Sequence, residues 1–353
     1  MPNKKTKVVS FEAVLQILAD EQVIIPTNLL PHFSDLEGNN LNAFKSLWKK
    51  ISHDRKISFL SDMTDWDETD TLVNFESVAH VALQDPDGQV RAKGIKLLNN
   101  TEDPKLVPIL ANILKRDPEE KAREAAAVLL GKFIYLGELE EIPEQIYQMA
   151  LDALFLVPQT ESEIVRQRVL ESIGYSSNSE VSERIEAAYN LGKSNWKESA
   201  LRAMGRSADE HWEKLVLENL DHDIFGIQLA AVEAAGELEL KKAKKALTLL
   251  LKDAQNLEPR LFSAVVWSLS QIGGENVKSI LEALADMTED DATLEIIEDA
   301  LDNLELNEMF AREMFDFTKI DDEDHETLID LDDENEDDDG SDEDDHFLNA
   351  RLN

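Results

Sequence analysis

The chain has 353 residues, of which 35 are Lys or Arg and 74 are Asp or Glu, so its net charge is −39. Proteins that bind DNA or RNA gain affinity by neutralising phosphates, so this charge argues against nucleic-acid binding, and equally against docking on anionic membranes. It favours a protein partner with a basic surface. Because cysteine is absent, disulfides, thiol catalysis and Cys-ligated zinc are excluded.

The amino-terminal residues predict no targeting signal. The basic start MPNKKTKVV is followed by SFEAVLQILADEQ, which carries acidic residues and no small-residue cleavage site. The longest uncharged run of the repeat region, 261–274, is too short to span a bilayer. We therefore expect a cytoplasmic protein that does not enter the membrane.

Residues 1–40 are predicted to form an amino-terminal helical cap, with a leading helix within 11–31. A first pair of amphipathic helices follows at 41–51 and 55–63. Gly and Pro are scarce, with 13 and 10 residues, and Ala, Leu and Glu are abundant, which favours helix along the chain. No stretch alternates apolar and polar residues convincingly, so no strand is predicted.

A ten-residue segment then recurs six times, which indicates a repeat architecture. The copies are VRAKGIKLLN (90–99), AREAAAVLLG (122–131), VRQRVLESIG (165–174), WKESALRAMG (196–205), IQLAAVEAAG (227–236) and LFSAVVWSLS (261–270). Their last residues are 32, 43, 31, 31 and 34 positions apart, and the spacing of 43 marks an insertion around YLGELEEIPEQIYQ. The positions nine, five, four and one before each last residue are always apolar or small. At 100° per residue they cover one arc of about 140°, so we predict that this helix face is buried.

Another amphipathic helix precedes each copy, as at 72–83, 105–115, 211–220 and 244–253. Proline ends the first helix of a pair and suits the first turn of the next, and the joining turns contain Pro86, Pro118 and Pro259. A last pair is predicted at 277–287 and 293–302. Since neither helix of a pair can bury its face alone, the pairs must stack on their neighbours. We therefore predict an all-α solenoid of about eight helix pairs over 41–317, and we expect a monomer.

The composition changes after residue 317, and 318–353 is predicted to be a disordered acidic tail. It holds 17 Asp or Glu against Lys319 and Arg351, a net charge of −15, which leaves −24 on the solenoid. The run 332–345 lacks apolar surface and repels itself. Three roles are open to this tail. It could fold back onto the solenoid, present its last residues to a second protein, or only make the chain soluble.

The two-helix unit, the period of about 32 residues and the pattern D-P-x(4)-R resemble bacterial HEAT repeats, and more narrowly the phycobilisome-lyase-like HEAT group. The resemblance covers roughly residues 40–305. It implies a right-handed, superhelical, armadillo-like solenoid. It defines function poorly, because the fold hosts many functions.

In HEAT repeats, an Asp in the turn and an Arg six residues later form a ladder along the stack. The residues that match this spacing are Asp85 with Arg91 and Asp117 with Arg123. Glu161 and Arg166 are one residue short, and later units hold Lys197, Gln228 and Phe262 at the Arg position. The resemblance therefore implies a structural ladder in the first units only.

The second helices of HEAT repeats line the concave surface, so the resemblance implies that outward side chains of the six copies form a binding face. Six and three positions before the end of the copies, the outward residues include Lys93, Lys96, Arg168, Glu171, Arg202, Glu233 and Trp267. Because exposed Arg and Trp are enriched in binding hot spots, the candidate partner-binding residues are Lys93, Lys96, Arg168, Arg202 and Trp267. The alternative is a solvated face of mixed charge with Trp267 packed under the neighbouring unit.

No catalytic, cofactor-binding or metal-binding residue is predicted. The sequence has no G-x-S-x-G, P-loop or G-x-G-x-x-G motif. The deoxyhypusine hydroxylases, a HEAT enzyme class, hold two irons with several His-Glu pairs, and the one such pair here is His325-Glu326, in the acidic tail. The leading hypothesis is therefore a non-enzymatic scaffold or assembly factor that binds a protein on the concave face. The alternatives are a bilin lyase of the phycobilisome type and a HEAT-like nucleic-acid repair enzyme.

Overall fold

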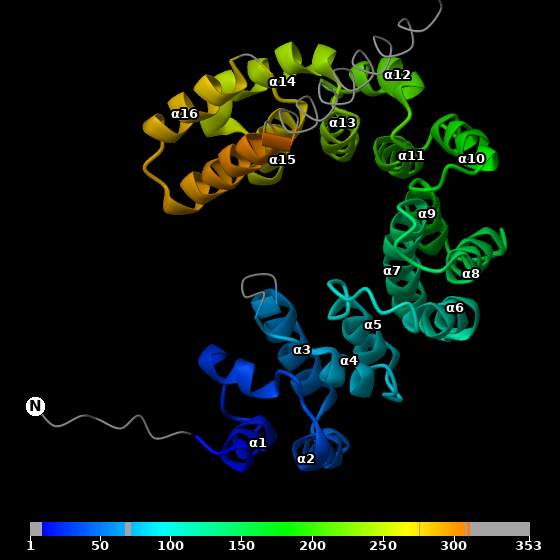
Figure 1. Ribbon diagram of the computed structural model, residues 1–353, viewed down its shortest axis with the longest axis vertical. Coiled ribbons are helices and arrows are strands. Elements are labelled where there is room, and N and C mark those ends of the chain that lie inside the picture. Colours follow the sequence, from blue (N-terminus) through cyan, green and yellow to red (C-terminus); the bar gives the residue numbers. More distant parts are fainter. Residues whose placement is uncertain (1–8, 68–71, 275, 308, 311–353) are drawn as a thin grey trace, which may run out of the picture. The chain divides into compact units, whose positions relative to one another are not determined.

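The computed structural model describes residues 9–67, 72–274, 276–307 and 309–310. Every regular element in these ranges is an α-helix or a 3-10 helix, which confirms the all-α fold class (Figure 1). The chain divides into two units after Gly274. No helix in the described ranges is long and apolar enough to cross a membrane.

The amino-terminal region is held together by packed aromatic rings. Its elements are α1 (Phe11–Ala19), the 3-10 helix η1 (Thr27–Phe33), α2 (Gly38–Trp48) and α3 (His53–Asp67). Four buried rings meet with centroids 4.8 to 6.4 Å apart, and they belong to Phe33, Phe44, Trp48 and Phe59. The predicted cap and the first helix pair therefore share one core.

Helix pairs follow in chain order, as the repeats predict. The first helices of the pairs are α4 (Glu76–Ala82), α6 (Leu106–Arg116), α8 (Glu144–Phe155), α10 (Ser179–Tyr189), α12 (Glu213–Leu217) and α14 (Lys244–Leu250). The 3-10 turns η2 (Glu210–Trp212), η3 (Lys241–Ala243) and η4 (Leu251–Asn256) flank the last two. The second helices are α5 (Gly88–Lys96), α7 (Glu120–Glu138), α9 (Glu163–Ile173), α11 (Ser194–Arg206), α13 (Phe225–Glu237) and α15 (Pro259–Ile272). The insertion adds no element, because it lengthens α7 and then supplies the start of α8.

The array is built on its second helices, each of which packs against the next: α5 on α7, α7 on α9, α9 on α11, α11 on α13 and α13 on α15. All predicted arc positions are buried, including Val169, Ala200 and Ala231, which confirms the predicted face. Small residues allow the helices to approach closely. A Cβ added to Gly174 would lie 2.8 Å from the Ala203 carbonyl oxygen and 2.9 Å from its Cα.

Turn residues fix where the second helices begin. The Asp87 side chain caps α5 by accepting hydrogen bonds from the backbone N–H groups of Gln89 and Val90. Glu258 caps α15 in the same way, and Pro259 occupies the first helical position, where its missing N–H costs nothing. The turns therefore set the register of the face that each helix buries.

The carboxyl-terminal unit contains α16 (Val277–Met287) and a helix over 291–307. Lys278 Nζ and Glu305 Oε1 lie 2.6 Å apart and join these two helices. The predicted tail, 318–353, lies outside the described residues, as does the pair His325-Glu326. The predicted domain limits and the right-handed twist stay predictions.

Candidate functional site

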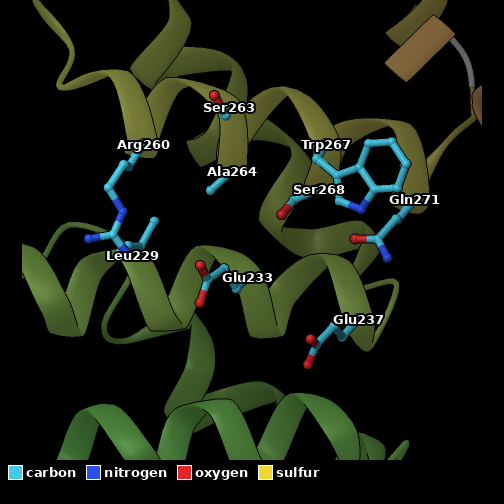
Figure 2. A pocket seen from close by; sticks show the side chains of 9 residues that line it. All are labelled: Leu229, Glu233, Glu237, Arg260, Ser263, Ala264, Trp267, Ser268 and Gln271. Carbon is cyan, nitrogen blue, oxygen red and sulfur yellow. The ribbon is translucent and has the colours of Figure 1, made fainter. Parts of the chain in front are cut away.

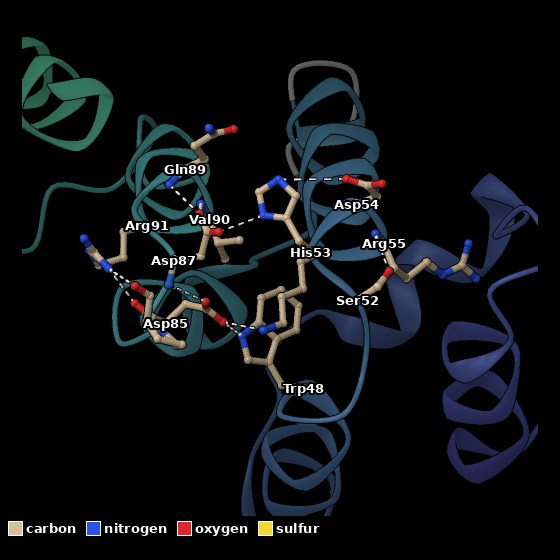
Figure 3. Close-up of polar contacts among 12 residues, drawn as sticks. Trp48, Ser52, His53, Asp54, Arg55, Asp85, Asp87, Gln89, Val90 and Arg91 are labelled. Atoms are coloured by element: carbon tan, nitrogen blue, oxygen red, sulfur yellow. Dashed lines mark hydrogen bonds and ion pairs between the residues drawn. The ribbon is translucent and has the colours of Figure 1, made fainter. Parts of the chain in front are cut away.

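The turn before α5 carries a buried polar cluster around Asp85 (Figure 3). Its carboxylate accepts hydrogen bonds from Trp48 Nε1 at 2.8 Å, from Lys56 Nζ at 2.7 Å and from the Asp87 backbone N–H at 2.9 Å. The side chain of Asp85 is 1% exposed and that of Lys56 is 11% exposed. The ion pair connects α3, and the Trp48 hydrogen bond connects α2, to the turn before α5 in a place that water hardly reaches.

Arginines continue this cluster from one unit to the next. Arg91 donates two hydrogen bonds to the Asp117 carboxylate, at 2.6 and 2.7 Å, and one to the Asp85 carbonyl oxygen. Arg123 donates two hydrogen bonds to the Glu161 carboxylate, at 2.8 and 2.9 Å, and one to the Asp117 carbonyl oxygen. Hydrogen bonds from Arg123 hold the pKa of Glu161 below its ordinary value. The four predicted ladder residues therefore lie in one chain of contacts, in which Glu161 is the last carboxylate to accept two hydrogen bonds from one arginine.

Beyond Glu161 other contacts take the place of these forks. Lys197 Nζ lies over the Tyr189 ring, 4.9 Å from its centroid, and Gln228 donates to the Leu220 carbonyl oxygen at 3.0 Å. Arg166 donates to the Glu161 carbonyl oxygen and stacks over Trp196. These groups are occupied inside the array, which gives them a structural role.

The outward side chains of α5 to α15 form what we call the second-helix surface. Three hollows follow one another along it. A groove of about 720 Å³ lies on α3, α5 and α7, a hollow of about 390 Å³ lies on α9 and α11, and a pocket of about 410 Å³ lies on α13 and α15. Arg168 lines both the first and the second hollow, so the surface continues from one to the next.

Of the predicted partner-binding residues, Lys93 and Lys96 line the first groove together with Lys121 and Arg168. Among the described residues, none forms an ion pair or a hydrogen bond with the ammonium group of Lys93, Lys96 or Lys121. We call this hollow the lysine groove. Its lysines are available to a ligand.

Arg168 and Arg202 are largely engaged inside the array. Arg168 pairs with Glu124 at 3.5 Å and also with Glu171. Arg202 pairs with Glu198 at 3.1 Å and with Glu233 at 3.3 Å. The prediction that Glu171 points outward is wrong: it is 3% exposed, because Arg168 and the following helix α11 cover it.

Trp267 lies at the third hollow and is 44% exposed (Figure 2). Its helix also supplies Arg260, Ser263, Ala264 and Gln271 to the lining. The facing helix supplies Glu233 and Glu237, one turn apart. This pocket therefore combines an open aromatic ring with carboxylates and one guanidinium group.

Glu237 has an unusual carboxyl group for a surface residue. The residue is exposed, yet its Oε2 lies so close to α11 that a Cβ added to Gly205 would be 2.2 Å away. Removal from water raises the pKa of Glu237 to about 7, against the opposing effect of the Arg206 charge and with a further rise from Glu233. The carboxyl group therefore changes its charge near neutral pH.

This pKa makes the stability of the protein depend on pH. The unfolded chain loses the Glu237 proton near pH 4.5, whereas the folded chain keeps it up to about pH 7, so ionisation costs stability as pH rises between these values. We expect Glu237→Gln to gain melting temperature relative to the wild type between about pH 5 and about pH 8. Thermal unfolding at both pH values measures this gain, with Glu186→Gln on the exposed face of α10 as the control. If the melting temperature of Glu237→Gln differs from that of the wild type by the same amount at pH 5 and at pH 8, the raised pKa of Glu237 is contradicted.

Two residues of this surface were missed by the sequence analysis. Lys121 lies one residue before its repeat copy and Glu237 one residue after its copy, so neither fell in a compared column. Helical spacing could have found Glu237, which follows Glu233 by one turn. Within the described residues, no group of three His, Asp or Glu side chains is arranged to hold a metal ion.

Comparison with known proteins matches no family model and no curated protein. Among solved structures, the chain is similar to YibA of Escherichia coli, with 14% identity over 81% of this chain and 98% of that one and a TM-score of 0.40. It is also similar to the complex of CpcE and CpcF of phycocyanin lyase from a Nostoc species, with 15% identity, 86% and 98% coverage and a TM-score of 0.42. For yeast importin-beta (Kap95p) the values are 12% identity, 84% of this chain, 46% of that chain and a TM-score of 0.42. The stacked helix pairs of the present chain are themselves those of a HEAT-like α-solenoid.

Proposed function

We propose that this protein is a non-enzymatic scaffold or assembly factor that holds a partner protein along the second-helix surface. The observation that carries the proposal is that side chains suited to binding remain exposed at the two ends of this surface. They are the three lysines of the lysine groove at one end and the ring of Trp267 at the other. Exposed aromatic rings of this kind are enriched among the residues that dominate binding energy.

The charges of the surface change along the array, which supports recognition at several points. The groove on α5 and α7 offers three free lysines. The pocket on α13 offers Glu233, which also pairs with Arg202, and Glu237, which gains its negative charge as the pH rises through about 7. A partner that matches both ends in charge is fixed in direction as well as in position, because the reversed orientation brings like charges together. A partner with a basic region opposite α13 fits this pattern and the overall net charge of −39.

A pair of substitutions at the two ends tests the proposal. We expect Lys96→Glu with Trp267→Ala to lower the capture of a partner polypeptide by about tenfold or more, since Trp267 is a hot-spot candidate and the change at Lys96 reverses a charge. The matched control is Lys115→Glu with Leu156→Ala, at an exposed position of α6 and at the exposed residue that caps the end of α8. Affinity capture followed by mass spectrometry gives the partner and its recovery, and thermal unfolding verifies that both variants fold.

Equal recovery with the surface variant and the control contradicts the proposal. Pure protein that carries a coloured tetrapyrrole and captures no polypeptide supports the bilin-lyase alternative instead. Salt-dependent binding of duplex DNA supports the nucleic-acid repair alternative.

A further inference from the structure

The lysine groove is positive in a protein that is otherwise strongly negative. The chain has 74 acidic and 35 basic residues, yet Lys93, Lys96 and Lys121 have no acidic partner in the described part of the chain. The acidic groups beside them are engaged elsewhere: Glu124 pairs with Arg168, and Asp67 accepts a hydrogen bond from Asn100. A cationic groove has thus been left open where acidic side chains are plentiful.

Apolar side chains also line the groove. Val128 of α7 is 45% exposed, whereas Ala125 and Leu129 of the same helix and Ala92 of α5 are buried. An exposed valine costs solvation free energy, which an apolar side chain of a ligand recovers when it covers Val128 in the groove. The groove therefore suits a ligand that carries negative charges and one apolar group.

The three lysines come from two helices that pack on each other. Lys93 and Lys96 are three residues apart on α5 and so lie on one face of that helix, while Lys121 comes from the first turn of α7. Long lysine side chains keep their charge in water while their stems cover apolar surface, so they can follow carboxylates of an extended ligand.

We propose that the lysine groove binds a short acidic segment of the partner protein, with carboxylates on the three lysines and one apolar side chain on Val128. This inference rests on the proposed function and names the chemistry of the partner at one end of the second-helix surface.

A short segment suits this protein better than a nucleic acid does. The Debye length at physiological salt is about 8 Å, so a ligand confined to the groove senses mainly the local lysines. A duplex extends well beyond the groove and meets the negative remainder of a chain with net charge −39. The positive charge of the groove therefore acts only over a short distance, so it favours a compact anionic ligand over an extended one.

The test uses the full chain and a fluorescein-labelled short peptide of alternating Asp and Glu with one central Leu. We expect anisotropy to show saturable binding that weakens with salt, and binding to be lost for the peptide in which Asn and Gln replace the acids. Lys93→Gln, Lys96→Gln and Lys121→Gln together should weaken binding by about tenfold, as three exposed charge pairs imply. The control with the same change of charge is Lys105→Gln, Lys115→Gln and Lys245→Gln, all exposed and outside the groove. Val128→Gln should weaken the Leu peptide and leave a peptide with central Gln unaffected.

Three results overturn the inference: no binding of the acidic peptide, equal binding by the triple variant and its control, or tighter binding of duplex DNA than of the peptide. Tighter binding of a peptide with the sequence of residues 332–345 would assign the groove to this chain's own acidic run and would overturn the assignment to a partner. If the peptide fails while Lys96→Glu with Trp267→Ala still loses the partner, the second-helix surface binds by other chemistry and the proposed function stands.

Discussion

Asp85→Ala is expected to lower the free energy of unfolding by about 4 kcal/mol, which is typical when one partner of a buried ion pair is removed. The substitution leaves the Lys56 ammonium group buried without its carboxylate, and it also leaves Trp48 Nε1 without its acceptor. Both costs arise because Asp85 is almost inaccessible to water, which therefore cannot replace the lost contacts. Urea unfolding followed by circular dichroism measures the change.

The matched control for this substitution is Asp103→Ala. Asp103 also accepts a backbone hydrogen bond in a turn, from Lys105, but its side chain is 41% exposed, so the expected loss is about 1 kcal/mol. Adding Lys56→Met to Asp85→Ala should recover part of the loss, because the uncompensated charge is then gone. If Asp85→Ala costs no more than Asp103→Ala, the buried ion pair does not hold the first units together.

Phe59→Ala is expected to cost about 4 kcal/mol of unfolding free energy, since it empties the centre of the amino-terminal aromatic core. The ring is fully buried and lies 4.8 Å from that of Phe33, 6.2 Å from that of Phe44 and 6.4 Å from that of Trp48. The surrounding rings come from different elements and cannot all move inward to fill the cavity.

Phe225→Ala is the control for the aromatic core, because Phe225 is 37% exposed at the start of α13 and its removal leaves little cavity. Its expected cost is about 1 kcal/mol, measured by the same urea unfolding. Similar losses for the two variants would show that the aromatic cluster is not a shared core of η1, α2 and α3.

The buried faces of the second helices could be predicted because the information is local. Positions such as Ala200 and Ala231 recur at a spacing that puts them on one side of a helix, and a helix in a stacked array buries only that side. Pro86 and Pro118 marked the turns for an equally local reason, since proline lacks the N–H that a helix interior needs.

The candidate site could be predicted only in part, because it depends on what the neighbouring helix covers. Periodicity gave Glu171 an outward direction about its own axis, but Arg206 of the next unit donates to its carbonyl oxygen and Arg168 closes over its carboxylate. Likewise, Glu161 accepts the Arg123 fork from 38 residues away, across a lengthened α7, and no fixed spacing predicts that contact. Contacts between neighbouring helix pairs therefore determine which charged side chains remain unpaired on the surface.

The side chains that form no ion pairs within the array are the ones available for binding on the second-helix surface. Arg168 and Arg202 stabilise the array through their pairs with Glu124 and Glu233, so they are poor sites for a test of binding. Lys96 and Trp267 have exposed side chains at the two ends of the same surface. The first helices offer exposed positions of similar kind, at Lys115 and Leu156, for comparison.

Photo-crosslinking in cells that make this protein tests the central claim most directly. A benzophenone amino acid is placed in turn at Lys96, Trp267, Lys115 and Leu156, and adducts are identified by mass after irradiation. A partner polypeptide crosslinked from Lys96 and Trp267, and not from the two first-helix positions, is the predicted result. Adducts that form equally from all four positions, or only from Lys115 and Leu156, would contradict recognition along the second-helix surface.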